Sequence, residues 1–106
     1  MKILFLGDIV GVSGCTKIKK NLSSIIKNKD VDFVVANAEN ADVSGVGLTK
    51  NICEDLFLSG VNVITTGNHV WDQKDIMNFI DKENRLLRPK NLFEPSPGKG
   101  FEIYTT

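Results

Sequence analysis

Three short, mainly apolar runs, each followed closely by polar residues, constrain the fold of this chain more than any other feature of its sequence. They span residues 2–6, 31–36 and 61–66. Runs of this length, rich in apolar and β-branched side chains, are typical of strands in a parallel sheet that is buried on both faces. Because parallel neighbours need a crossover between them, we expect a helix after each strand.

The segments between the runs have the composition of helices. Apolar residues recur at helical spacing in residues 14–28, with lysines largely between them. Thr49 suits the N-cap of a second helix, which Gly60 would end, and Asp72 suits the N-cap of a third helix that extends to residue 81. The resulting order, βαβαβα, predicts an α/β fold with a mainly parallel sheet and right-handed crossovers.

The last part of the sequence does not complete this pattern. Residues 83–100 contain all three prolines and are expected to form an irregular connection, whereas residues 101–106 have the composition of a further strand. Two or three helices on three or four strands would leave one face of the sheet poorly covered. We therefore expect residues 1–106 to be a single but incomplete domain, either a fragment of a longer protein or one subunit of a homo-oligomer.

Charge and hydropathy exclude several classes of partner. Thirteen basic residues balance thirteen acidic residues, so the chain has no net attraction for nucleic acid or for an anionic membrane, and any anion binding must be local. The first apolar run is too short for a signal peptide, and no run has the length of a membrane span. We expect a cytoplasmic protein whose two cysteines, Cys15 and Cys53, are reduced.

Candidate functional residues follow the three predicted strands. Asp8 follows the first strand, Glu39 and Asn40 follow the second, and Asn68 and His69 follow the third. The carboxyl ends of parallel strands share one edge of the sheet, where open α/β folds bind their ligands. Carboxylates, amide oxygens and an imidazole together suit manganese, iron or zinc. Each residue alone has an ordinary explanation as a cap, turn or surface residue, so the hypothesis depends on all three clusters meeting.

With these residues, the sequence resembles the calcineurin-like metallophosphoesterases, and in particular their bacterial branch of 2′,3′-cyclic-nucleotide 2′-phosphodiesterases. The resemblance covers essentially the whole chain and rests on ILFLGDIVG, NAENADVSGVGLT, TTGNHVWD, LLRPKNL and PGKG, in that order. It implies that the chain is the amino-terminal part of a metallophosphoesterase-type α/β sandwich.

By matching position, the resemblance implies a centre of two divalent metal ions, with iron and manganese the favoured metals. Asp8 would bind the first metal, Glu39 would bridge or bind both, and Asn40 and Asn68 would bind through their side-chain oxygens. His69 would be the catalytic acid or a phosphate contact beside the metals. The implied substrate is a small phosphodiester or nucleotide, which includes RNA-derived ligands.

The sequence also departs from the wider superfamily. Val10 stands where that superfamily often has the histidine of D-x-H, and Val70 stands where it often has an acidic residue after GNH; both departures agree with the narrower branch. A later G-H-x-H segment supplies further histidine ligands in the family, and residues 1–106 lack it. We therefore expect little or no phosphodiesterase activity from these residues alone. The alternative is a non-catalytic, degenerate module that binds metal or a nucleotide.

Overall fold

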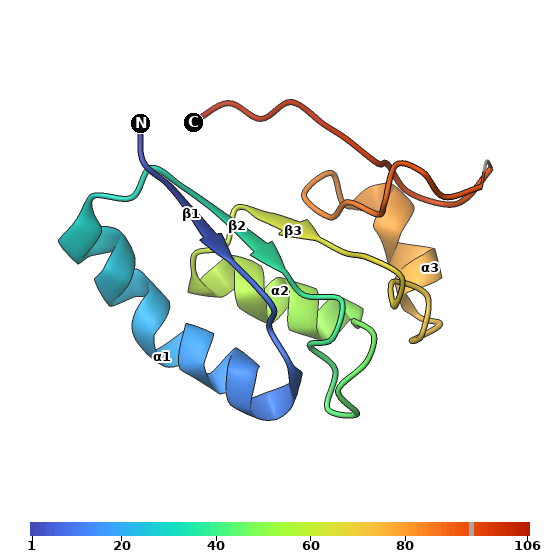
Figure 1. Cartoon of the computed structure of the whole chain (residues 1–106), viewed down its shortest axis with the longest axis horizontal. Coiled ribbons are helices and arrows are strands. Elements are labelled where there is room, and N and C mark those ends of the chain that lie inside the picture. Colours follow the sequence, from blue (N-terminus) through green and yellow to red (C-terminus); the bar gives the residue numbers. More distant parts are fainter. Residues whose placement is uncertain (94) are drawn as a thin grey trace.

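The three predicted strands form a parallel sheet in the order β1–β2–β3. The computed structural model describes residues 1–93 and 95–106. In it, β1 (Ile3–Leu6) pairs with β2 (Phe33–Asn37), which pairs with β3 (Val63–Thr65) (Figure 1). Each strand is shorter than its apolar run because pairing begins only after the first residues of the run. The predicted α/β class with a parallel sheet is confirmed.

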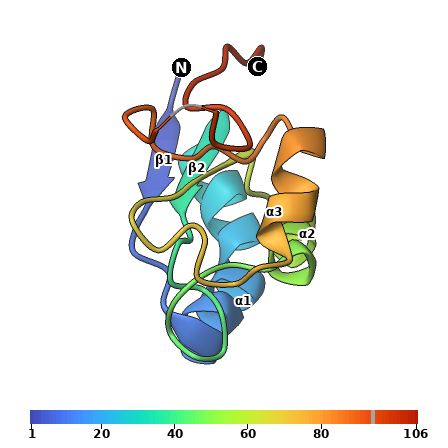
Figure 2. The ribbon, with the colours of Figure 1, turned by 90° about the vertical axis from the view of Figure 1, so that its right-hand side faces the viewer.

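Two long helices connect the strands. The first helix, α1 (Gly11–Lys29), begins three residues earlier than the periodicity predicts. The second, α2 (Lys50–Ser59), has the predicted ends. The Thr49 side chain accepts a hydrogen bond from the backbone N–H of Ile52, and Gly60 adopts a left-handed conformation with a φ of 119°. Both helices lie on the same side of the sheet (Figures 1 and 2).

The prediction of a third helix from Asp72 to residue 81 is wrong in its length and its cap. The chain forms turns after β3, in which Val70 N–H donates to Gly67 and Asp72 N–H donates to His69. Helix α3 (Ile76–Phe79) follows, and the 3-10 turn η1 (Ile80–Lys82) continues from it. Because the Asp72 carboxylate contacts an imidazole instead of helix N–H groups, it cannot cap this helix.

The two faces of the sheet differ in burial. The face toward α1 and α2 is closed, since Val34, Ala36 and Ile64 are buried there. On the other face, Ile3 and Phe5 of the edge strand β1 remain 62% and 63% exposed. The prediction that the first strand is buried on both faces is therefore wrong, whereas one poorly covered face agrees with expectation. The homo-oligomer that could cover it stays a prediction.

Residues after η1 extend and cover part of the sheet without forming a further strand. Ile64 N–H donates to Arg85 O at 2.7 Å, and Leu87 N–H donates back to Ile64 O at 2.9 Å, so residues 85–87 run beside β3. The predicted strand at residues 101–106 is wrong, because this segment has no strand pairing. It is anchored by Tyr104, whose ring lies 6.1 Å from that of Phe33.

The helices of the described chain do not combine the length and hydropathy that a membrane crossing requires. This finding concerns residues 1–93 and 95–106.

Candidate metal site at the strand ends

The loops that follow the three strands meet at one edge of the sheet, which we call the rim (residues 7–10, 38–42 and 66–69). The first two loops continue the pairing of β1 with β2. Ile9 N–H donates to Asn37 O at 3.1 Å, and Gly11 N–H donates to Asn40 O at 3.0 Å. This pairing brings the side chains of Asp8 and Asn40 together, and Asn40 Nδ2 donates to Asp8 Oδ2 at 2.9 Å.

The second and third loops are joined through a carboxylate. Ala38 N–H donates to Thr65 O at 3.1 Å, which continues the pairing of β2 with β3. The partly buried Glu39 side chain then reaches across, and its Oε2 accepts the backbone N–H of His69 at 3.0 Å. A hydrogen bond to an ionised carboxylate is about twice as strong as a neutral one. Glu39 thus ties the loop that carries the histidine to the end of β2.

Gly67 leaves the room that this arrangement needs. A Cβ atom at position 67 would lie 2.7 Å from Glu39 Oε2 and 2.8 Å from Glu39 Cδ. Any side chain there would therefore displace the carboxylate. The glycine of the TTGNHVWD motif is explained by this contact.

The nitrogen of the Asn40 side-chain amide has a hydrogen-bond partner, whereas its oxygen has none among the described residues. Its nitrogen donates to Asp8, whereas its Oδ1 is buried and lacks a hydrogen-bond partner among the residues that the structure describes. Buried polar atoms are nearly always paired, so a buried oxygen without a partner requires an explanation such as an ion. An amide oxygen is a suitable ligand for a hard divalent cation. The residues present therefore fit the implied metal ions at this position.

His69 has a partner that the sequence analysis missed. Its Nδ1 lies 2.7 Å from Asp72 Oδ2, and both side chains are a little over one-third exposed. A carboxylate on one ring nitrogen fixes the orientation of the imidazole and leaves the other nitrogen, Nε2, for a further contact. The spacing His-x-x-Asp in HVWD is the available signal, and the predicted helix cap assigns that aspartate to a different role.

A second missed residue, Gln73, braces the loop after β2. Its Nε2 donates to Val46 O at 3.1 Å and lies within 3.3 Å of Asp42 Oδ2. Hydrogen bonds from the backbone N–H and the hydroxyl of Ser44 lower the pKa of the Asp42 carboxyl. The loop of residues 42–47 is thus held against the turn that carries His69.

The structure brings some predicted site residues into contact and leaves others at the surface. Asp8 contacts Asn40 directly, and Glu39 contacts the backbone of His69. Asn68 lies between Gly67 and His69, and its side chain is exposed. Within residues 1–93 and 95–106, no three His, Cys, Asp or Glu side chains are grouped so that they could hold a metal ion together. The described chain thus offers two carboxylates and amide oxygens, which is part of a coordination shell.

Comparison with known proteins identifies relatives of the whole chain. The family model described as "YmdB-like protein" matches residues 4–106. A "2′,3′-cyclic-nucleotide 2′-phosphodiesterase" of Bacillus subtilis (strain 168) is 44% identical over 101 residues, which cover 95% of this chain and 38% of that protein. The chain thus spans well under half the length of this curated relative.

Two solved structures have the same fold over this length. A hypothetical protein from Thermus thermophilus superimposes with a TM-score of 0.90 at 33% identity and is covered to 40% by this chain. A structure described as a novel phosphatase, from Mycoplasma pneumoniae, gives a TM-score of 0.87 at 38% identity and is covered to 39%. The match extends over 100% and 98% of this chain, respectively.

Proposed function

Since the chain belongs to the family of YmdB-like proteins, we propose that it contributes to the metal-dependent hydrolysis of phosphodiesters, with 2′,3′-cyclic nucleotides as the substrate class. The substrate class comes from the name of the Bacillus subtilis relative. The description of the Mycoplasma pneumoniae structure as a phosphatase supports chemistry at a phosphoester.

The contact between Asp8 and Asn40, together with the open Oδ1 of Asn40, is the observation that carries this proposal. The metal ions would be held by Asp8, Glu39, Asn40 and Asn68. Two divalent ions, iron or manganese, would supply Lewis-acid stabilisation of the negative charge on the phosphoryl oxygens. The chain itself supplies anionic and amide oxygens on loops that follow the strands, and the loops of Asp8 and Asn40 are positioned by hydrogen bonds that continue the pairing of β1 with β2.

His69 would act on the leaving group. Asp72 accepts from Nδ1 at 2.7 Å, so His69 would donate from Nε2 as the imidazolium, which carries a proton on both nitrogens, and would pass that proton to the departing alkoxide. Histidine suits this step because its ring nitrogens can carry and release a proton. Glu39 contributes twice, as a metal ligand and as the acceptor that fixes the His69 backbone.

We expect the 106-residue chain to hydrolyse phosphodiesters slowly or not at all by itself. It supplies one histidine in total, and the part that the structure describes has no three-residue group of strong metal ligands. Loss of even supporting residues around a metal costs about 10–100-fold in affinity or activity. The same observation favours a second candidate, a non-catalytic module that binds one metal ion or a nucleotide without turnover.

The number of metal ions bound per chain distinguishes the hydrolase from the non-catalytic module, and the effect of a rim substitution on affinity tests whether the rim binds them. We propose calorimetric titration of the chain with manganese, on the wild type and on Asn40→Ala, with the exposed Asn51→Ala of α2 as the matched control. Two ions per chain would support the hydrolase, and one ion the non-catalytic module. Asn40→Ala should weaken binding by at least about 10-fold, whereas equal binding by both variants would reject the rim as the metal site.

Turnover tests the role of the imidazole. Manganese-loaded chain is assayed with 2′,3′-cyclic AMP and with a chromogenic phosphodiester, beside His69→Ala. The rate of hydrolysis should be lower in His69→Ala than in the wild type. Manganese binding should persist, because the imidazole is assigned to the leaving group and not to the metal ions. Undiminished hydrolysis by His69→Ala would reject its assignment as the acid.

A further inference from the structure

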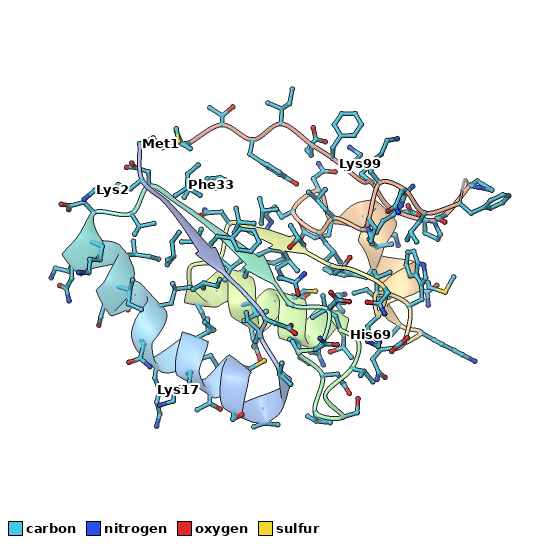
Figure 3. All side chains as sticks on the ribbon, viewed as in Figure 1. Met1, Lys2, Lys17, Phe33, His69 and Lys99 are labelled. Carbon is cyan, nitrogen blue, oxygen red and sulfur yellow. The ribbon has the colours of Figure 1, made fainter. Side chains whose placement is uncertain are left out.

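Two motifs that the rim does not use meet at a separate place on the molecule. Residues 86–90, from LLRPKNL, and residues 97–102, which include PGKG, run side by side, and Arg88 N–H donates to Lys99 O at 2.9 Å. Between them lies a cleft of about 380 Å³, lined by three basic residues, two glycines, Phe101 and Glu102. Lys99 is labelled at this place in Figure 3, well above His69 of the rim.

The walls of this cleft concentrate positive charge. The chain as a whole balances thirteen basic against thirteen acidic residues, but among the described residues the lining contains Arg88, Lys90 and Lys99 beside the carboxylate of Glu102. Glu102 pairs with Lys99 at 2.9 Å in an exposed ion pair, which is worth little in water. A local excess of cations draws anions even on a neutral protein.

Arg88 has a structural role in the cleft. Arg88 is 4% exposed, and its guanidinium donates to the carbonyl oxygens of Pro97 and Pro89 at 3.1 Å. These bonds hold the two segments together from inside. The ammonium groups of Lys90 and Lys99 are then left on the walls, where their side chains are exposed.

The glycines allow the two walls to approach. A Cβ atom on Gly100 would lie 2.5 Å from Lys90 Cα, and one on Gly98 would lie 2.7 Å from Ile80 Cγ1. Both distances are shorter than any real contact, so only glycine fits at these positions. The Gly98 N–H donates to Asp81 Oδ1 at 2.6 Å, so it holds its segment to η1, and the phosphate contacts are left to the lysines.

An aromatic ring completes the lining. Phe101 is 67% exposed, and Lys90 Nζ lies 5.5 Å from the centre of its ring. Exposed rings beside lysines are the arrangement that stacks nucleobases and neutralises their phosphates. The volume falls within the range of small-ligand sites, roughly 300–1,000 Å³.

We propose that this cleft is a second anion site, which binds the phosphate of a nucleotide through Lys90 and Lys99 and places the base against Phe101. The site is independent of the metal ions at the rim, so it does not rest on the proposed hydrolase function. Its ligand chemistry is an aromatic base joined to a phosphate, and inorganic phosphate alone would lack half of the contacts.

The test uses AMP as the probe and EDTA to remove any metal-dependent binding at the rim. Calorimetry at low salt compares the 106-residue wild type with Lys90→Ala/Lys99→Ala. The matched control is Lys17→Ala/Lys20→Ala, which removes the same charge from exposed positions of α1; Figure 3 shows Lys17 of this helix far from Lys99. The first pair should weaken AMP binding at least about 10-fold and the control pair less than about 2-fold. If both double variants weakened AMP binding equally, the binding would be non-specific charge attraction and the proposal would be wrong.

Phe101→Ala tests the base contact separately. Stacking of one base on an aromatic ring is worth about 1–3 kcal/mol, so AMP should bind at least about 5-fold more weakly, while binding of inorganic phosphate stays unchanged. Equal wild-type affinities for AMP and phosphate would overturn the proposal.

An NMR titration of the wild type needs no variant. AMP should shift the amide signals of Lys90 and of residues 98–102 and leave those of Asp8 and His69 in place. Shifts at the rim alone, or no saturable binding up to about 10 mM AMP, would overturn the proposal as well.

Discussion

Gly67→Ala should destabilise the chain through a single contact. The new Cβ atom would lie 2.7 Å from Glu39 Oε2, so the carboxylate has to turn away. The His69 N–H then loses its acceptor, which now lies at 3.0 Å. Hydrogen bonds to charged groups contribute about 1.5–3 kcal/mol, and we expect a loss of this size in the free energy of unfolding. Each kcal/mol lowers the midpoint of thermal unfolding by about 4–8 °C for a domain of this size.

A double-mutant cycle with Glu39→Ala isolates this contact. Gly67 is not among the residues with positive φ, so alanine fits its backbone once the carboxylate is gone. In the Glu39→Ala background, Gly67→Ala should therefore be neutral or stabilise by about 0.4–1 kcal/mol, because alanine lowers the entropy of the unfolded chain. The sign of the effect is predicted to reverse between the two backgrounds.

Urea unfolding measures the four free energies, followed by circular dichroism and by the fluorescence of Trp71, which packs near the rim against the core. Gly45→Ala is the matched control. A Cβ atom there meets nothing within 4 Å, but the φ of 89° strains alanine, so its cost should be the same with and without Glu39. If Gly67→Ala costs the same in both backgrounds, the contact with Glu39 is not the cause and our account of this glycine is wrong.

Three further predictions concern other contacts. Asp72→Ala should change the tautomer balance of His69, the only histidine, toward the form with its proton on Nε2, which long-range ¹⁵N NMR detects; an unchanged imidazole spectrum would contradict the 2.7 Å contact. Thr49→Ala should cost about 1 kcal/mol in urea unfolding and Thr49→Ser much less, because only alanine lacks the capping oxygen. Hydrogen bonds from Arg85 lower the pKa of Glu83, so this pair stabilises the fold above the ordinary pKa and is lost as pH falls through the lowered one. Glu83→Gln should therefore flatten the acid side of a stability-against-pH curve by less than about 1 kcal/mol; an unchanged curve would show that the pair contributes nothing.

The parts of the fold that depend on local chemistry could be predicted from the sequence. Both ends of α2 are set by Thr49 and Gly60, which act within one turn of the helix. The parallel sheet follows from the short apolar runs, because each needs a crossover helix to reach its neighbour. The convergence of Asp8 with Asn40 follows in turn, since their loops leave adjacent strands.

The predictions that proved wrong were overridden by specific contacts that periodicity and composition do not encode. The periodicity of residues 72–81 is helical, but the first residues form the turn that places Asp72 against His69, and only α3 and η1 remain. Residues 101–106 have strand composition, yet Arg85 and Leu87 already pair with β3 along that edge. The apolar composition of β1 predicts burial on both faces, but composition cannot show whether a second layer is present.

The Asn40 amide suggests how the parallel sheet would order the proposed metal site in advance of binding. An amide has a donor end and an acceptor end, so the bond from Nδ2 to Asp8 at 2.9 Å decides which atom faces inward. The inward atom is Oδ1, the buried acceptor that has no partner among the described residues. In the proposed site Asp8 would serve both as acceptor for Asn40 and as metal ligand, which its two oxygens permit. Because β1 and β2 set the distance between these residues, their side chains lose little further freedom on binding, and the cost of ordering the ligands is met when the sheet forms.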